Sequence, residues 1–158
     1  MKKLVVLGGG ESGIGAAALA KHNNWDVFVS DAGRLTADAK LEFETIGISY
    51  EEGGHTIKKI LEAELVVKSP GIPNTAAVVL DIEAAKIPIV SEIEFAINYT
   101  DATLIGITGS NGKTTTAMLT HHLLSDGGIN AGLAGNIGNS FAQALLQDKH
   151  DVYVLEIS

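Results

Sequence analysis

The chain has 158 residues, 46% of them hydrophobic, and a formal net charge of −8. This length can form one ordinary core, or a small domain and part of another. The acidic balance argues against nucleic-acid binding, because no basic stripe offsets repulsion by phosphates. The lack of cysteine excludes disulfides and thiolate metal sites. Because no apolar run is long enough to span a membrane, we expect a soluble, cytoplasmic protein.

The first part of the chain alternates short apolar segments with helical ones. Strands are expected at residues 4–7, 27–30, 48–50, 64–68 and 87–90. Helices are expected at residues 14–21, 37–45, 55–62, 75–86 and 92–97. Successive β-α-β units build a parallel sheet through right-handed crossovers. The polar, unpatterned segment 98–102 then predicts a boundary, so we assign residues 1–100 to a Rossmann-like domain.

A glycine fingerprint follows the first expected strand. Gly8-Gly-Gly-Glu-Ser-Gly13 is a G-x-G-x-x-G sequence, and Asp31 stands at the end of the next strand. This spacing is typical of dinucleotide-binding folds. The fingerprint alone is weak evidence, since the glycines could serve only the turn and the packing of the helix. We favour a nucleotide-type ligand, with Ser69-Pro-Gly-Ile-Pro73 as a second loop at the ligand-binding edge.

Residues 103–116 combine a strand, a glycine-rich loop and a helix. The apolar run at 103–107 predicts a strand covered on both faces, and a helix is expected from Lys113 to Ser125. The loop amides and the helix N-terminus would bind phosphate. The residues expected at the phosphates are Gly109, Ser110, Asn111, Gly112, Lys113, Thr114 and Thr115. Lys113 is the expected catalytic residue at the terminal phosphates, and Thr114 is an expected Mg²⁺ ligand.

The segment after this helix predicts two further strands, at 130–134 and 151–158, and a helix at 140–146. Glu156 ends an apolar strand parallel to the one feeding the loop, which favours a metal-binding role. Asn136 stands between two glycines, where it could also serve only a left-handed turn. Three strands make a thin core, so we expect residues 103–158 to be the N-terminal part of a P-loop α/β domain, with Glu156 near an exposed edge.

The order of these motifs resembles the N-terminal portion of the Mur ligase family, closest to its D-glutamate-adding members. The matching blocks are Gly8 to Gly13, Ser69 to Pro73, Glu92-Ile-Glu94, Gly106 to Thr116, and Gly135-Asn-Ile-Gly138 with Leu155-Glu-Ile-Ser158. The family shares a phosphate loop that departs from the strict pattern, which would require glycine where this chain has Ile107. The run Ala32-Gly33-Arg34 departs from the Asp-Thr-Arg of the family, which leaves the role of Arg34 open.

The resemblance implies a ligase that uses ATP and Mg²⁺ to join D-glutamate to UDP-N-acetylmuramoyl-L-alanine through an acyl phosphate, in peptidoglycan synthesis. It also implies a set of ligand contacts in both domains. These are Glu11 and Ser12 at the UDP, Asp31 near the uracil, Gly71 at the diphosphate, Asn136 at the sugar–peptide substrate, Lys113 at the ATP phosphates, and Thr114 and Glu156 at Mg²⁺.

Two alternatives stay open. An NAD-dependent oxidoreductase would explain the fingerprint at 8–13 but not the second phosphate loop. A non-catalytic nucleotide-binding module would explain both loops without chemistry. We expect the 158 residues alone to be inactive as a ligase, because no segment supplies a pocket for D-glutamate. We also expect a monomer whose only partners are small-molecule substrates.

Overall fold

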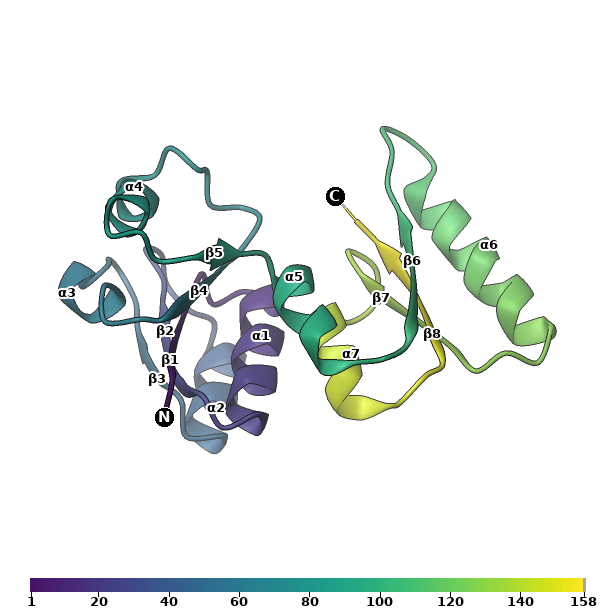
Figure 1. The fold of residues 1–158 in the computed structure, drawn as a ribbon, viewed down its shortest axis with the longest axis horizontal. Coiled ribbons are helices and arrows are strands. Elements are labelled where there is room, and N and C mark those ends of the chain that lie inside the picture. Colours follow the sequence, from purple (N-terminus) through teal and green to yellow (C-terminus); the bar gives the residue numbers. More distant parts are fainter. Residues whose placement is uncertain (158) are drawn as a thin grey trace.

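The computed structural model describes residues 1–157 and contains two parallel sheets (Figure 1). The first sheet has five strands in the order β3-β2-β1-β4-β5. Their bounds are β1 (Lys3–Leu7), β2 (Asp26–Ser30), β3 (Ser49–Glu51), β4 (Leu65–Lys68) and β5 (Ile89–Val90). Every neighbouring pair is parallel, which confirms the predicted Rossmann-like α/β arrangement.

Helices cover both faces of this sheet (Figure 1). They are α1 (Glu11–His22), α2 (Ala37–Thr45), α3 (Ile57–Ile60), α4 (Ala77–Ala84) and α5 (Glu92–Ala96), which continues as a 3₁₀ turn, η1 (Ile97–Tyr99). Alternate residues of β1 enter opposite cores, as the period of a strand requires. Leu4 and Val6 pack with α1 and α2, whereas Val5 and Leu7 pack with α3 and α4.

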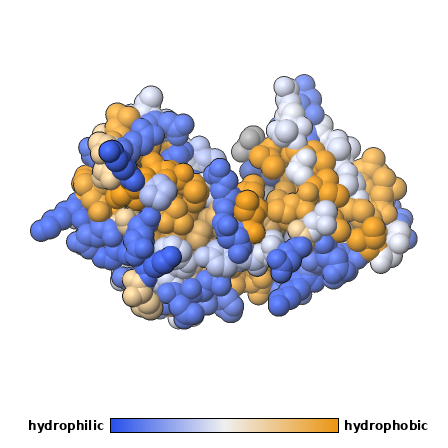
Figure 2. Space-filling model, in the orientation of Figure 1, coloured by the Kyte–Doolittle hydropathy of each residue, from blue (hydrophilic) through white to orange (hydrophobic). Residues whose placement is uncertain are grey.

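The second sheet has three strands in the order β6-β8-β7. They are β6 (Thr103–Ile107), β7 (Ala131–Gly135) and β8 (Val152–Glu156), joined by helices α6 (Lys113–Asp126) and α7 (Phe141–Gln147). Helix α6 packs on this sheet and leaves Met118, Leu119 and Leu123 exposed. Figure 2 accordingly shows apolar residues gathered over this half of the molecule. Within residues 1–157, no helix combines the length and apolar character needed to cross a membrane.

Two expectations about the second sheet were wrong. The strand feeding the phosphate loop, β6, lies at the sheet edge, and none of its five residues is buried. Glu156, expected near an exposed edge, ends the central strand and is only 6% exposed. Both errors have one cause, because the last strand of the chain inserts between the two earlier ones. An apolar run does not reveal that order.

Some helix bounds also differ from expectation. Helix α1 begins at Glu11 instead of residue 14, so part of the glycine fingerprint lies inside its first turn. A Cβ on Gly13 would lie 1.9 Å from the carbonyl oxygen of Gly8, so this glycine lets α1 pack closely on the end of β1. The helix expected at 55–62 is only four residues long. Apolar periodicity identified these helices but not their ends.

Helix α7 joins the two halves of the molecule. It follows β7 in sequence, yet it packs against α1 and α5 (Figure 1). Its buried Phe141 and Ala142 belong to the same apolar cluster as the core side of α1. Helix α7 approaches α1 at Gly15, where an added Cβ would lie 2.1 Å from Ser140 Oγ. The two sheets therefore share one apolar core, and the division into domains near residues 98–102 stays a prediction.

Candidate functional site

The loop between β6 and α6 leaves a helix N-terminus open. Gly112 is the N-cap of the 14-residue α6 and has φ of 74°, a conformation that side-chain-bearing residues rarely adopt. No side chain caps this helix, so no side-chain oxygen occupies its first amides. Ser110, Asn111 and Thr115 are exposed around it. An uncapped N-terminus with exposed amides is suited to binding an anion.

The side chains of Lys113 and Thr114 lie on this loop. Lys113 Nζ donates a hydrogen bond to the carbonyl oxygen of Gly109 at 2.8 Å, which holds its charge over the loop. Thr114 Oγ1 donates to Glu156 Oε2 at 2.9 Å, although the two residues are 42 positions apart. The register explains this contact, since Glu156 pairs with Ile107 just before the loop. The structure thus brings together the three side chains expected at phosphate and metal.

The Thr114–Glu156 pair fits a magnesium ion in its chemistry. A hydroxyl and a carboxylate are hard oxygen donors, and Mg²⁺ usually combines one or two such ligands with water and phosphate oxygens. Glu156 is buried, and no basic side chain in residues 1–157 forms an ion pair with it. A buried carboxylate without a counter-charge favours a cation beside it. The described residues contain no cluster of three or more His, Asp or Glu that could hold a metal, so this pair would supply two protein ligands at most.

Asn136 lies beside this pair. Its backbone N–H donates to the carbonyl oxygen of Glu156 at 3.0 Å, and the preceding Gly135 N–H donates to Asn139 at 3.0 Å. The Asn136 side chain is exposed. The loop after β7 is therefore attached to the end of β8, next to the phosphate loop.

A pocket of about 370 Å³ lies at the carboxyl ends of β1, β2 and β4. It brings Asp31 and Gly71 together, as expected for the UDP site. The two Asp31 carboxylate oxygens accept hydrogen bonds at 2.7 Å from the backbone N–H groups of Gly9 and Gly33. His55 also lines this pocket, and our sequence analysis did not identify it.

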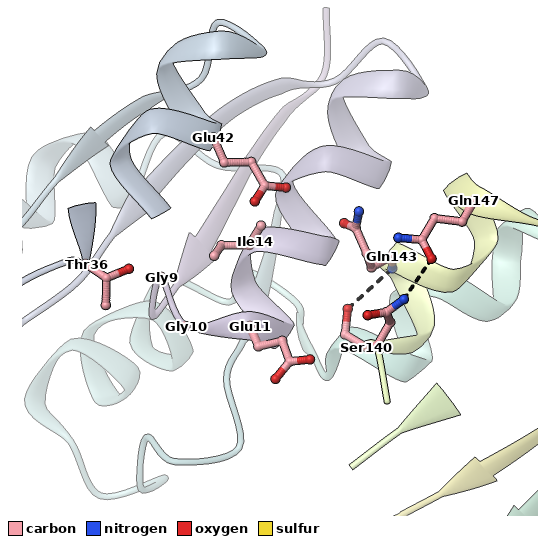
Figure 3. Close-up of a pocket in the computed structure, with 10 residues that line it drawn as sticks. Gly9, Gly10, Glu11, Ile14, Thr36, Glu42, Ser140, Gln143 and Gln147 are labelled. Atoms are coloured by element: carbon pink, nitrogen blue, oxygen red, sulfur yellow. Dashed lines mark hydrogen bonds between the residues drawn. The ribbon is translucent and has the colours of Figure 1, made fainter. Parts of the chain in front are cut away.

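Glu11 lines a different pocket, of about 380 Å³, between the start of α1 and α7 (Figure 3). The opposite wall carries three amide side chains, Asn139, Gln143 and Gln147. The buried Oε1 of Gln143 has no hydrogen-bond partner within residues 1–157. Ser12 lines neither pocket. Of the four residues expected at UDP, Asp31 and Gly71 thus line one pocket and Glu11 lines the other.

Glu92 connects α5 to α7. Its side chain is buried and accepts a hydrogen bond from the backbone N–H of Ala142, in the first turn of α7. Burial raises the pKa of Glu92 to about 7. Glu94 has a different role, because it forms a capping box with Ser91 at the start of α5. Sequence reasoning found this motif only by resemblance, and the partner of Glu92 could not be found from spacing.

Comparison with protein families supports the resemblance. Residues 3–78 match the MurD N-terminal domain, and residues 107–158 match the Mur ligase middle domain. The chain is 54% identical over 158 residues to a UDP-N-acetylmuramoylalanine–D-glutamate ligase of Bacteroides fragilis, covering 100% of this chain and 36% of the relative. It is 52% identical over 157 residues to the ligase of the same name from Christiangramia forsetii, covering 99% and 35%.

A solved structure shows the same fold. The UDP-N-acetylmuramate:L-alanyl-gamma-D-glutamyl-meso-diaminopimelate ligase of Neisseria meningitides superposes with a TM-score of 0.65 at 23% identity, covering 99% of this chain and 52% of that one. The chain spans about a third of the length of the curated relatives that it matches. Together, the two family models and these relatives show that the chain belongs to the Mur ligase family and matches the N-terminal part of its D-glutamate-adding members.

Proposed function

We propose that this chain supplies the UDP-substrate site and the ATP-phosphate site of a ligase that adds D-glutamate to UDP-N-acetylmuramoyl-L-alanine. The observation that carries the proposal is the contact between Thr114 and Glu156 beside an uncapped phosphate loop. The names of relatives at 52–54% identity support the choice of substrate. We also propose that the protein is a cytoplasmic monomer.

The proposed reaction joins a carboxylate to an amine. ATP would transfer its terminal phosphoryl group to the carboxylate, which would give an acyl phosphate and release ADP, and Mg²⁺ would neutralise charge on the phosphates. Lys113 and the first amides of α6 would orient the terminal phosphates and stabilise the charge that develops on them. Thr114 and Glu156 would hold the metal ion. The amine of D-glutamate then attacks the acyl carbon, and phosphate leaves.

The two openings beside the glycine loop would bind the other substrate. Asp31 and Gly71 would contact the uridine diphosphate in one pocket, and Glu11 would contact it from the other. Ser12, which lines neither pocket, would contact it from the first turn of α1. Asn136 would contact the sugar–peptide end, because its loop is fixed beside Glu156. This arrangement would place the terminal carboxylate of the substrate near the ATP phosphates.

The comparisons do not favour the oxidoreductase alternative, since the relatives are named as ligases. Two glycines of the fingerprint have structural roles that do not depend on NAD, since Gly13 packs closely on the end of β1 and Gly8 has a φ of 90°.

Calorimetric titration of the chain with UDP-N-acetylmuramoyl-L-alanine and with NADH tests the proposal. We expect the UDP-linked compound to bind and to compete with free UDP, while NADH gives no heat of binding. Tighter binding of NADH than of the UDP compound would contradict the proposal.

A further inference from the structure

The pocket that contains Asp31 and Gly71 also contains an oriented imidazole. His55 lies in the segment between β3 and α3 and is one of the residues that line the pocket. Asp31 and His55 are the only ionisable side chains in the lining, which otherwise consists of glycine, alanine, valine, isoleucine and proline. Such a wall suits a flat ring or a sugar with a few polar groups.

A chain of two hydrogen bonds fixes the imidazole. Ser30 Oγ, fully buried at the end of β2, lies 2.7 Å from His55 Nδ1 and 2.7 Å from Glu51 Oε1. Glu51 Oε1 also accepts a hydrogen bond from the backbone N–H of Thr56 at 2.7 Å. Burial acts to raise the pKa of Glu51, but the hydrogen bonds from Thr56 and Ser30 outweigh it and hold this pKa below its usual value.

These contacts determine which nitrogen of His55 carries the proton. An ionised Glu51 can only accept, so the single hydroxyl proton of Ser30 is donated to Glu51. Ser30 Oγ must then accept from His55, which requires a proton on Nδ1. In the neutral ring, Nε2 is therefore an acceptor, and it makes no hydrogen bond within residues 1–157. His55 Nε2 and the carboxylate of Asp31 are thus two acceptors carried by residues that line the pocket.

We propose that His55 is a specificity-determining residue of this pocket, which accepts a hydrogen bond at Nε2 from a donor group of the nucleoside in the UDP-linked substrate. The donor is either a ring N–H of the base or a hydroxyl of the ribose. Ser30 and Glu51 act as positioning residues that hold the imidazole in this tautomer. This inference rests on the proposed function, because it assigns a further residue to the proposed UDP site.

The test measures UDP affinity of the 158-residue chain by calorimetry. His55→Phe keeps an aromatic ring and removes both nitrogens, and we expect it to weaken UDP binding at least tenfold. Ser30→Ala leaves His55 in place but releases it, and we expect a smaller loss. His22→Phe, at the exposed end of α1, is the matched control and should bind as the unaltered chain does.

Two ligand analogues distinguish the donor. If the ring N–H is the partner, His55→Phe should not weaken the binding of a UDP methylated at N3. If a ribose hydroxyl is the partner, the variant should not weaken the binding of 2′-deoxy-UDP or 3′-deoxy-UDP. Equal loss with all of these ligands would show that the ring acts only by shaping the pocket, which would overturn the proposal.

Nitrogen NMR of the unaltered chain gives a readout that does not depend on the folding of any variant. We expect the Nε2 resonance of His55 to shift when UDP binds, while Nδ1 stays protonated. An unchanged Nε2 resonance at saturating UDP, or equal UDP affinity of His55→Phe, would overturn the role of His55 alone. No UDP binding by the unaltered chain would overturn the proposed UDP site as well.

Discussion

At the scale of single residues, the proposed phosphate site would depend on two side chains with different roles. Lys113 provides a positive charge over the loop, held by the carbonyl oxygen of Gly109. Glu156 provides a buried negative charge, reached by the hydroxyl of Thr114. Neither residue contributes much to the apolar core, so substitutions that remove their charges should affect ligand binding more than folding.

Lys113→Ala should weaken ATP binding by at least about tenfold, because one charge-assisted contact to phosphate contributes on the order of 1.5–3 kcal/mol. The melting temperature should change little, since Lys113 belongs to neither apolar core cluster. Titration with a fluorescent ATP analogue measures the effect, with Lys58→Ala on α3 as the matched control. Unchanged ATP affinity in Lys113→Ala would contradict the assigned role.

Glu156→Gln should remove the dependence of ATP binding on magnesium. The amide keeps the size of the side chain and can still accept from Thr114, but it no longer offers a negative charge to a divalent ion. In the unaltered chain, ATP should bind more tightly with Mg²⁺ than with EDTA. If the variant shows the same gain with Mg²⁺, Glu156 does not hold the metal.

At the scale of elements, helix α7 sets the position of the second half against the first. It contacts α1 at Gly15 and receives the carboxylate of Glu92 at its first turn. The loop carrying Asn136 immediately precedes this helix, so the packing of α7 also positions that loop relative to the glycine loop of β1. The contact with Glu92 and the contact with Gly15 can each be tested separately.

Glu92→Gln should flatten the dependence of stability on pH. The pKa of Glu92 is about 7 in the folded chain and near 4.5 in the unfolded chain. The carboxyl group therefore stays protonated to a higher pH in the folded chain than in the unfolded chain. The free energy of unfolding should therefore fall as pH rises from 4.5 to 7, by at most about 3 kcal/mol. Glutamine keeps a hydrogen-bond acceptor for Ala142 but does not titrate, so the variant should not show this fall in the free energy of unfolding. Urea unfolding at pH 5 and pH 8 measures it, and equal pH dependence in both proteins would contradict the assignment.

Gly15→Ala should destabilise the chain by about 1–3 kcal/mol, because the new methyl group would overlap the serine that caps α7. Gly10→Ala is the matched control, since a Cβ there meets no atom within 4 Å. Thermal unfolding of the two variants compares them directly. A Gly15→Ala protein as stable as Gly10→Ala would show that α7 does not depend on this close approach.

The helices and strands also show how much of the structure could be predicted from the sequence alone. The strand, glycine-rich turn and helix at residues 103–126 were predicted because an apolar run, glycines and then helix-forming residues follow one another there, while phosphate binding by this turn stays a prediction. The bounds of α2 were predicted correctly, and Thr36 caps that helix. The central position of β8, the partner of Glu92 and the contact of His55 with Ser30 could not be predicted. Each depends on residues distant in sequence, which meet only after the sheets and helices have packed.

At the scale of the whole molecule, the carboxyl-terminal edges of the two sheets, where we propose that ligands bind, face the same way. The carboxyl ends of β1 and β6 both point towards the upper side of Figure 1, where the loop between β6 and α6 extends above the sheet. Figure 2 shows that this face is hollowed between the two halves of the molecule. A substrate bound at one edge could therefore extend towards a phosphate bound at the other.

The most direct test of the proposed ligase function is a chimera. The chain would replace the matching 158 residues of the Bacteroides fragilis relative, to which it is 54% identical. We expect the purified chimera to form product from UDP-N-acetylmuramoyl-L-alanine, D-glutamate and ATP, and to lose that activity when Lys113 is changed to alanine. A folded chimera with no turnover, or one whose turnover survives Lys113→Ala, would contradict the account.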